Sequence, residues 1–224
     1  MSSLDDTQSV RAKRSVITSG GIVFVITADQ RGSRRTGSRA ASRMRELSEK
    51  YDDDLLLPIA HYAGDELQFV SESATAVTAI SLEMNNDAWY VGIGIGGGTL
   101  GETAADSHGA AFEYAREAVT SAKPLPWGIA VRADDDELGA DAEAGLALLQ
   151  GIRSKRTDSG SDIAELVAEL GSVTAAAEEL GISVSAASKR ARIALLRHEA
   201  LGLPLAARLL AFANGSEVRG TVEA

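Results

Sequence analysis

Apolar residues in the first two thirds of the chain follow two spacings, one typical of strands and one typical of helices. Short apolar, often β-branched runs predict strands at residues 22–28, 55–63, 66–71, 88–95 and 127–131. Apolar residues three and four positions apart predict helices at residues 39–51, 77–84, 108–123 and 138–149. The first six elements have the order βαββαβ, so we predict an α/β (α+β) protein with a ferredoxin-like domain.

This order brings two acidic residues together. Pro58 fits a second strand at the sheet edge, because proline cannot donate to a central ladder. A helical crossover followed by a tight turn places the end of the first strand, at Asp29, and the turn residue Asp65 at the same end of the sheet. Converging carboxylates repel unless a cation lies between them, which predicts a Mg²⁺ or Mn²⁺ site. A simpler interpretation is that Asp65 belongs only to a tight turn and Asp29 only caps a helix.

The distribution of charge marks a domain boundary. Residues 1–152 carry 13 basic and 23 acidic side chains, whereas residues 153–224 carry 9 of each. The change falls beside a polar stretch that is typical of a linker. We therefore predict four segments, namely a flexible N-terminal arm (1–21), a ferredoxin-like domain (22–152), a linker (153–161) and a helical domain (162–224).

Composition excludes several classes of protein. The chain has no cysteine, which removes disulfide scaffolds and thiolate metal sites. No apolar stretch approaches the ~20 residues that span a bilayer, and residues 1–14 lack the apolar core of a secretory signal. We therefore expect a cytoplasmic protein with no membrane partner. The net charge of -10 argues against a chain-wide nucleic-acid surface but allows a local basic one.

A local excess of positive charge follows Asp29. Seven lysines and arginines lie within residues 31–50, and the first three are Arg31, Arg34 and Arg35. We expect these three to contact the phosphates of a nucleotide, since helix N-termini also attract anions. The alternative is a solvated helix face that pairs with the acidic residues 52–54. The glycine-rich segment 92–98 lacks a Lys-Ser/Thr pair, so it favours close helix packing over a phosphate loop.

Four segments together resemble the SatD family of small bacterial proteins. They are ITAD (26–29), AGDELQ (63–68), WYVGIGIG (89–96) and GAAFEYAREAVTSAK (109–123). The resemblance covers about residues 22–210. Up to about Val131 the same segments are similar, more distantly, to the palm domains of class III nucleotidyl cyclases and diguanylate cyclases. In those palms an aspartate after the first strand and an acid in the hairpin turn hold two metals on a nucleoside triphosphate.

The resemblance implies a metal site and a nucleotide. It implies Asp29 and Asp65 as metal ligands, with the main-chain carbonyl of Gln30 as an extra ligand. Lys123 matches a lysine that contacts the triphosphate in diguanylate cyclases.

The segment 173–192 carries a helix-turn-helix pattern after a helix predicted at 162–170. Ala177 is small enough for two helices to cross, Gly181 supplies the turn, and Ile182 fills the core between them. The pattern resembles the helix-turn-helix of sigma-factor and response-regulator families. The resemblance implies DNA contacts from six residues, Ser183, Ser185, Ser188, Lys189, Arg190 and Arg192. The alternative is a helical packing module that does not bind DNA.

Three functions follow from these patterns. The first is a DNA-binding regulator whose palm binds a metal-chelated nucleotide. The second is a palm-type nucleotidyl cyclase or nucleotidyltransferase that uses two metals on Asp29 and Asp65. The third is a structural module without a ligand. The apolar helix predicted at 195–213 further indicates a surface for a homo-oligomer.

Overall fold

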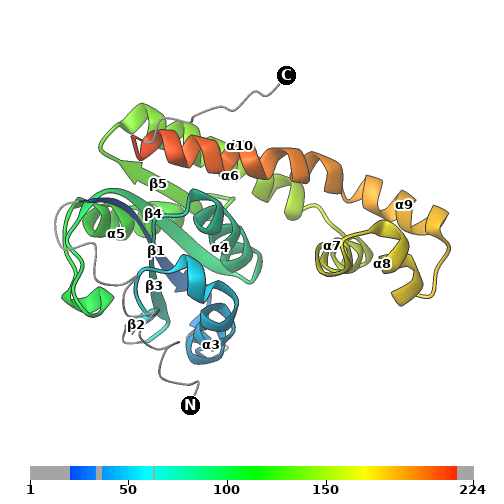
Figure 1. Ribbon diagram of the computed structural model, residues 1–224, viewed down its shortest axis with the longest axis horizontal. Coiled ribbons are helices and arrows are strands. Elements are labelled where there is room, and N and C mark those ends of the chain that lie inside the picture. Colours follow the sequence, from blue (N-terminus) through cyan, green and yellow to red (C-terminus); the bar gives the residue numbers. More distant parts are fainter. Residues whose placement is uncertain (1–20, 34–36, 63, 216–224) are drawn as a thin grey trace, which may run out of the picture.

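The computed structural model describes residues 21–33, 37–62 and 64–215, and it shows an α/β domain from which a helical unit projects (Figure 1). The strands are β1 (Gly21–Gln30), β2 (Ala60–Tyr62), β3 (Glu66–Ser71), β4 (Trp89–Gly98) and β5 (Ile129–Ala133). They form one sheet in the order β2-β3-β1-β4-β5. β1 is antiparallel to β3 and β4, β2 is antiparallel to β3, and β5 is parallel to β4. The first four strands have the ferredoxin-like order, which confirms the predicted fold class.

Helices cover both faces of this sheet and build the projecting unit. Those of the α/β domain are α3 (Ala40–Tyr51), α4 (Ala74–Asn86), α5 (Ala110–Ala122) and α6 (Asp136–Arg153), with short 3-10 turns η1 (Asp52–Asp54) and η2 (Ala104–Asp106). The helices that follow are α7 (Asp158–Leu170), α8 (Val173–Glu179), α9 (Val184–Ile193) and α10 (Leu196–Ala213). Among the described residues, no helix has the length and apolar character that a membrane crossing needs.

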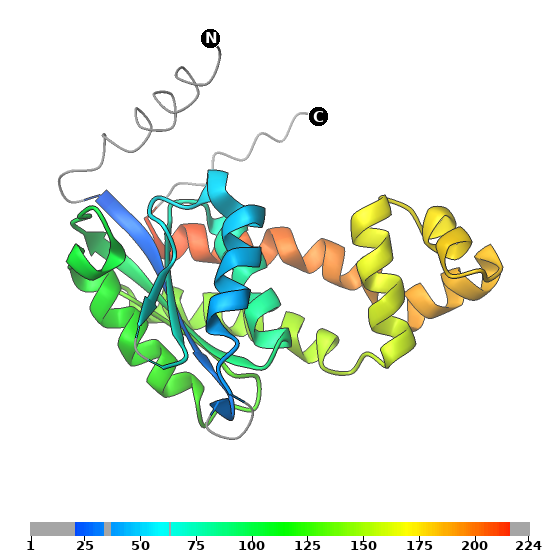
Figure 2. The same ribbon diagram turned by 90° about the horizontal axis from the view of Figure 1, so that it is seen from below.

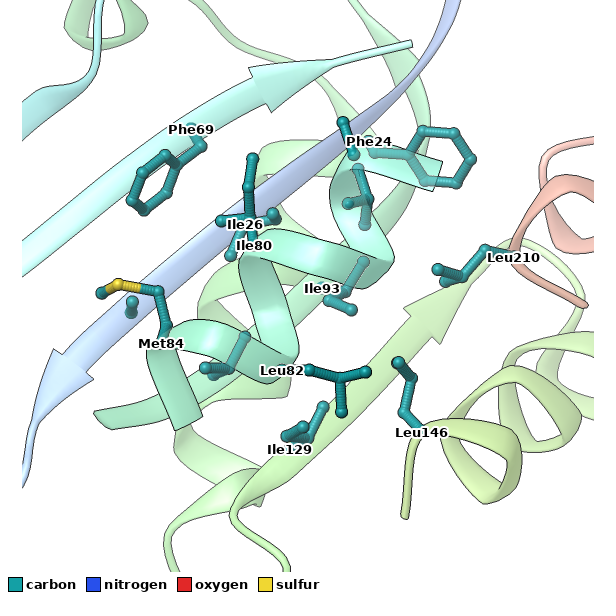
Figure 3. Packing of buried hydrophobic residues seen from close by; sticks show 14 of the residues in the cluster. Phe24, Ile26, Phe69, Ile80, Leu82, Met84, Ile93, Ile129, Leu146 and Leu210 are labelled. Atoms are coloured by element: carbon teal, nitrogen blue, oxygen red, sulfur yellow. The ribbon is translucent and has the colours of Figure 1, made fainter. Parts of the chain in front are cut away.

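β1 lies at the centre of the sheet and is buried on both faces. Phe24 and Ile26 point to the side covered by α3, α4 and α6, where they pack with Ile80 of α4 (Figure 3). Val23 and Val25 point to the other side, where α5 packs against them. This two-sided burial explains why the strand reads as a continuous apolar run instead of an alternating one.

α5 packs directly on the backbone of β4. A Cβ atom added at Gly94 would lie 2.0 Å from the carbonyl oxygen of Ala111, and one added at Gly92 would lie 2.0 Å from the backbone nitrogen of Val119. No side chain fits at either position. The glycine-rich segment is therefore a helix-packing surface, as its sequence predicts.

The two edges of the sheet differ. β2 lies at one edge, as Pro58 predicts, but the strand covers only residues 60–62 because Leu55 makes just an isolated bridge with Ser71. At the other edge, side chains satisfy the outer backbone groups of Val131 in β5. Its N–H donates to the Glu143 carboxylate at 3.1 Å, and its carbonyl accepts from Nη1 of Arg132 at 2.7 Å. Such capping protects an edge strand from pairing with another chain.

The connection between the two helical regions is shorter than the predicted linker. α6 continues to Arg153 and α7 begins at Asp158, so only residues 154–157 lie between them. Thr157 takes the extended N-cap conformation, and Gly160 is buried one turn later. A Cβ atom added at Gly160 would lie 3.4 Å from the Cβ of Ala194. The serine- and glycine-rich sequence resembles a linker, but it forms the packed first turn of a helix.

α10 returns to the α/β domain. It packs along α6 and α4, and its residues Ala206 and Leu210 belong to the main core (Figures 1 and 3). The predicted helical domain (162–224) is therefore divided, with α7 to α9 forming a small unit of their own (Figure 2) and α10 completing the first domain. Residues 216–224 and the predicted arm, apart from Gly21 in β1, lie outside the described residues.

Candidate functional site

A cavity of about 770 Å³ opens at the end of the sheet where β1 finishes. The residues that line it are Asp29, Gln30, Gly32, Ser33, Ser38, Gly64, Asp65, Tyr90 and Lys123. Both carboxylates that the topology predicts to converge line this one cavity. Gln30 and Lys123 line it as well.

The pairing of β1 with β3 explains this convergence. The register ends with Asp29 opposite Glu66, so the turn before β3 lies beside the last residue of β1. The N–H of Gln30 donates to the main-chain carbonyl of Asp65 at 3.2 Å. Gly64 has a φ of +98°, a left-handed conformation that favours glycine and lets the chain reverse here.

Asp29 forms an ion pair with Lys123, which follows the last residue of α5. The Asp29 side chain is 22% exposed and the Lys123 side chain 48% exposed. Because α5 packs directly on the glycines of β4, the sheet fixes the position of the C-terminal end of this helix and therefore of Lys123. The ammonium group of Lys123 therefore contacts Asp29, the residue that we predict to be a metal ligand.

Further side chains extend this site across the sheet. Tyr62, Glu66, Asp29 and Tyr90 oppose one another in register on β2, β3, β1 and β4, so they share one face of the sheet. Burial raises the pKa of Glu66, and the negative charge of Asp29 raises this pKa further, although nearby Lys123 opposes the effect. The acids at this end of the sheet repel one another, which favours a bound cation.

Gln30 holds the loop that precedes α3. Its side-chain Nε2 donates to the carbonyl of Gly37 at 2.9 Å, and its Oε1 accepts from the N–H of Arg39 at 2.7 Å. Ser38 lies in the same loop, where its hydroxyl accepts from the N–H of Ala40 at 3.2 Å. The N-terminus of α3 therefore borders the cavity through Ser38.

Arg31 lies behind the cavity wall. Its guanidinium stacks on the ring of Tyr90, 4.5 Å from the ring centre. The backbone N–H of Arg31 donates to the carbonyl of Ala88 at 2.9 Å. Arg31 is not part of the cavity lining. The other two arginines predicted to contact phosphate, Arg34 and Arg35, lie outside the described residues.

The basic residues of α3 pair with α4. Arg43 lies 2.8 Å from the carboxylate of Glu83, and Arg39 lies 3.1 Å from that of Asp87. The predicted pairing with residues 52–54 is wrong, because α3 packs beside α4 and these acids are the nearer ones. Burial alone would raise the pKa of Glu83, but hydrogen bonds from Lys50 and Tyr51 and the charge of Arg43 lower it.

Among the residues that the structure describes, no three acidic or histidine side chains are grouped closely enough to hold a metal ion. Asp29 and Asp65 are the two acidic residues in the described lining of this cavity. Mg²⁺ commonly binds proteins through one or two carboxylates and takes its other oxygens from phosphate and water. The donor set fits a metal that arrives with a phosphorylated ligand.

Five residues of the cavity lining are not among the predicted site residues, namely Gly32, Ser33, Ser38, Gly64 and Tyr90. The sequence does place Tyr90 at the start of a strand, but only the register with β1 shows that it lies opposite Asp29. The two serines lie in the connection between β1 and α3, where no periodic pattern reports their position.

The second predicted site lies on α9. Ser185, Ser188, Lys189 and Arg192 are exposed and have the i, i+3, i+4, i+7 spacing that places residues on one face of a helix. Ala187, on the opposite face, is buried against α7 and α8. The helix thus presents a polar, basic surface outward.

The other two residues predicted to contact DNA, Ser183 and Arg190, do not lie on this exposed face of α9 in the same way. Ser183 is the N-cap of α9, and its hydroxyl accepts from the N–H of Ala186 at 3.2 Å. Arg190 is half-buried. The helix-turn-helix geometry itself matches its sequence pattern, with Gly181 at a φ of +63°, Ala177 buried and Ile182 partly buried in the core of this unit.

A scan against protein-family models, a search of curated proteins and a search of solved structures each found no match. The resemblance to the SatD family therefore stays a prediction, and the functional argument depends on the geometry of the two sites.

Proposed function

We propose that this chain is a DNA-binding regulator whose ferredoxin-like domain binds a metal-chelated nucleotide. The observation that carries the proposal is the cavity in which Asp29, Asp65 and Lys123 meet. Its volume of about 770 Å³ lies within the range of about 300–1,000 Å³ that is typical of small-molecule sites.

The chemistry of the lining supports a phosphorylated ligand. The two carboxylates suit Mg²⁺ or Mn²⁺, and Lys123 and the N-terminus of α3 at Ser38 suit the phosphate groups that such a metal brings. Tyr90 adds an aromatic surface at the wall. The positive metal offsets the charge of the two carboxylates and of the phosphate, and Lys123 offsets further negative charge on the phosphate. Each charged group of the ligand therefore has a partner of opposite charge.

The α9 surface supports DNA as the partner of the helical unit. In a helix-turn-helix the second helix enters the major groove, where short polar side chains reach base edges and cations reach phosphates. Ser185 and Ser188 supply the first kind of group, and Lys189 and Arg192 supply the second.

A network of ion pairs and hydrogen bonds joins α6 and α10 of the first domain to α9. Glu199 of α10 is 7% exposed and binds Arg153 at the end of α6 at 2.5 Å, and it also binds Arg156 in the connecting segment. Nε of Arg156 donates to the carbonyl of Ala194, the residue that ends α9, at 3.1 Å. A shift of α6 or α10 in the first domain would therefore move the DNA-reading helix.

Nucleotide binding is tested by thermal unfolding with ATP, GTP or cyclic nucleotides, each with Mg²⁺ or Mn²⁺. A ligand that binds the folded state raises the unfolding temperature. We expect this rise to vanish in Asp65→Asn and to persist in Asp53→Asn, an exposed aspartate of η1. Turnover of the bound nucleotide would instead identify the chain as a nucleotidyl cyclase or nucleotidyltransferase. If no nucleotide has any effect, the structural module without a ligand is the better description.

DNA binding is tested by fluorescence anisotropy with duplex DNA at several salt concentrations. Each phosphate contact contributes a slope of about −0.9 to the dependence of log K on log salt. The double variant Lys189→Ala/Arg192→Ala is expected to bind more weakly and to flatten this slope by about 2. Arg208→Ala, an exposed arginine of α10, is the control. Unchanged binding in the double variant would exclude α9 as the reading helix.

A further inference from the structure

The outer surface of α6 and α10 carries several large exposed apolar side chains. Leu148 of α6 is 73% exposed, and three residues of α10 are exposed as well: Leu201 (71%), Leu205 (48%) and Phe212 (44%). The three residues on α10 are spaced i, i+4 and i+11, so they form one stripe, which the exposed Arg208 at i+7 interrupts. That stripe lies opposite the face that α10 buries through Ala206 and Leu210.

Leu148 belongs to the same surface. Where α6 and α10 touch, Leu209 approaches Gly145, and Leu149 approaches Gly202. Leu148 and Leu205 therefore lie at the same level on neighbouring helices, both directed outward.

A groove adjoins this surface. It has a volume of about 680 Å³ and runs between β5 and α6, with Val131, Ala133, Ala144 and Leu148 among its lining residues. Leu148 thus forms the boundary between the groove and the stripe. One face of the molecule carries both projecting leucines and an apolar hollow, which is the arrangement that a self-complementary interface requires.

The charges at the two ends of this face are opposite. Asp136, Glu137 and Asp141 are exposed near the start of α6, whereas the exposed Arg208 of α10 lies near the level of Gly145, at the middle of the face. Lys155 and Arg197 are exposed at the other end, near the start of α10. A two-fold axis perpendicular to the helices would place the basic end of one copy over the acidic end of the other.

The size of the face is also sufficient. Two packed helices of 18 residues each are about 27 Å long and about 20 Å across, a flat projection on the order of 500 Å². Side chains make the accessible area larger than the projection, which brings it toward the ~800 Å² that each partner contributes to a standard interface.

We infer that the α6–α10 face is an interface with a second copy of this chain, packed antiparallel about a two-fold axis. The leucines of one copy fill the groove of the other, and the basic end of each faces the acidic end of its partner. The interface does not depend on the proposed function. If that function also holds, the dimer carries two α9 helices related by symmetry, as dimeric helix-turn-helix proteins do on inverted repeats.

Sedimentation velocity across a wide range of protein concentration tests the inference. The wild-type chain is expected at twice its 23.3 kDa mass. Leu201→Glu/Leu205→Glu is expected to weaken dimerisation by about tenfold or more, because it places charge in the centre of the apolar contact. Both side chains are exposed, so the circular dichroism spectrum of a monomeric variant should match that of the wild type. Leu170→Glu changes an exposed leucine of α7 (41%) and is the control.

A charge swap tests the antiparallel arrangement. Arg197→Glu and Asp141→Arg are each expected to weaken the dimer, and the double variant is expected to restore it because the swapped ends again attract. A monomeric wild-type chain, a trimer or larger assembly, or a dimer that Leu201→Glu/Leu205→Glu leaves intact would overturn the inference. Failure of the double variant to recover would overturn the antiparallel packing.

Discussion

The ammonium group of Lys123 is paired with the carboxylate of Asp29 at the cavity where β1 ends. The pair joins the next-to-last residue of the central strand β1 to the residue that follows α5, the helix that packs on this face of the sheet. Lys123 therefore occupies a position that a metal ion bound to Asp29 would also seek. A ligand with both metal and phosphate resolves this competition, because the metal takes the acid and the phosphate takes the lysine.

Lys123→Ala is expected to affect metal and nucleotide in opposite directions. Without the competing cation, Mn²⁺ alone should bind about fivefold more tightly, which corresponds to ~1 kcal/mol, the size of the repulsion between unit charges about 4 Å apart in water. A Mn²⁺-nucleotide complex should bind more weakly, since it loses a phosphate partner. Isothermal titration calorimetry measures both, with Lys155→Ala as the control for an exposed lysine. Equal changes for metal and complex would argue against the competition.

Glu66→Gln is expected to stabilise the fold at neutral pH. Burial and the facing Asp29 raise the pKa of Glu66. A raised pKa means that this residue contributes most to stability below the ordinary glutamate pKa, and that the contribution falls as pH rises through the raised value. The variant should gain about 0.2–1 kcal/mol in the free energy of unfolding at about pH 7, the usual size of a like-charge cross-strand pair.

Urea unfolding of wild type and Glu66→Gln at neutral and acidic pH provides the measurement. The difference should shrink below about pH 4, where the glutamate is protonated in both states. Glu72→Gln, an exposed glutamate, is the control and should show no such dependence. A loss of stability in Glu66→Gln at neutral pH would contradict the proposed repulsion.

Gly94→Ala is expected to destabilise the protein by at least about 3 kcal/mol, because overpacking against rigid backbone exceeds the usual cost of an added methyl group. Its Cβ would meet the carbonyl oxygen of Ala111 at 2.0 Å. Gly97→Ala is the matched control in the same strand, where an added Cβ meets nothing within 4 Å. Chemical denaturation of both variants gives the comparison. Equal stability of the two would mean that α5 does not lie on the β4 backbone.

Glu199→Gln is expected to lower the free energy of unfolding by about 3 kcal/mol, since it leaves two partly buried arginines without their counter-charge. Burial by itself would raise the pKa of Glu199, but the hydrogen bond from Arg156 and the charges of both arginines lower it. The stabilisation is therefore present above the ordinary glutamate pKa and is lost as pH falls through the lowered value.

The pH dependence separates this contribution from a simple packing effect. The difference between wild type and Glu199→Gln should disappear in acid, where Glu199 itself is protonated. Glu165→Gln changes an exposed glutamate of α7 and should have little effect at any pH. A constant difference across the pH range would assign the loss to packing instead of charge.

Local patterns predicted the core of the fold and the centre of the candidate site. The apolar runs and Pro58 were enough for the order of the first four strands, because strand period and proline chemistry act on neighbouring residues. That order predicts that Asp29 and Asp65 lie at the same end of the sheet, and both residues line one cavity there. The strand order alone is enough to predict that two such positions lie close together, without knowledge of how the side chains pack.

The remaining features depend on tertiary packing that no local pattern reports. α10 is apolar on two faces, so its sequence does not say which one packs on α6 or that it returns to the first domain at all. Apart from Glu46, one turn from Arg43, the acids that pair with Arg39 and Arg43 lie 48 and 40 residues away, whereas residues 52–54 are closer in sequence and were the wrong choice. Tyr90 entered the site only through the register of β4 with β1.

The contact of Arg153 with Glu199 has an evolutionary consequence. It shows that the chain leaves the first domain at the end of α6 and re-enters it at the start of α10 at nearly the same point. The intervening three helices have a core of their own. The three helices could therefore be gained or exchanged as one segment in evolution without rebuilding the α/β domain.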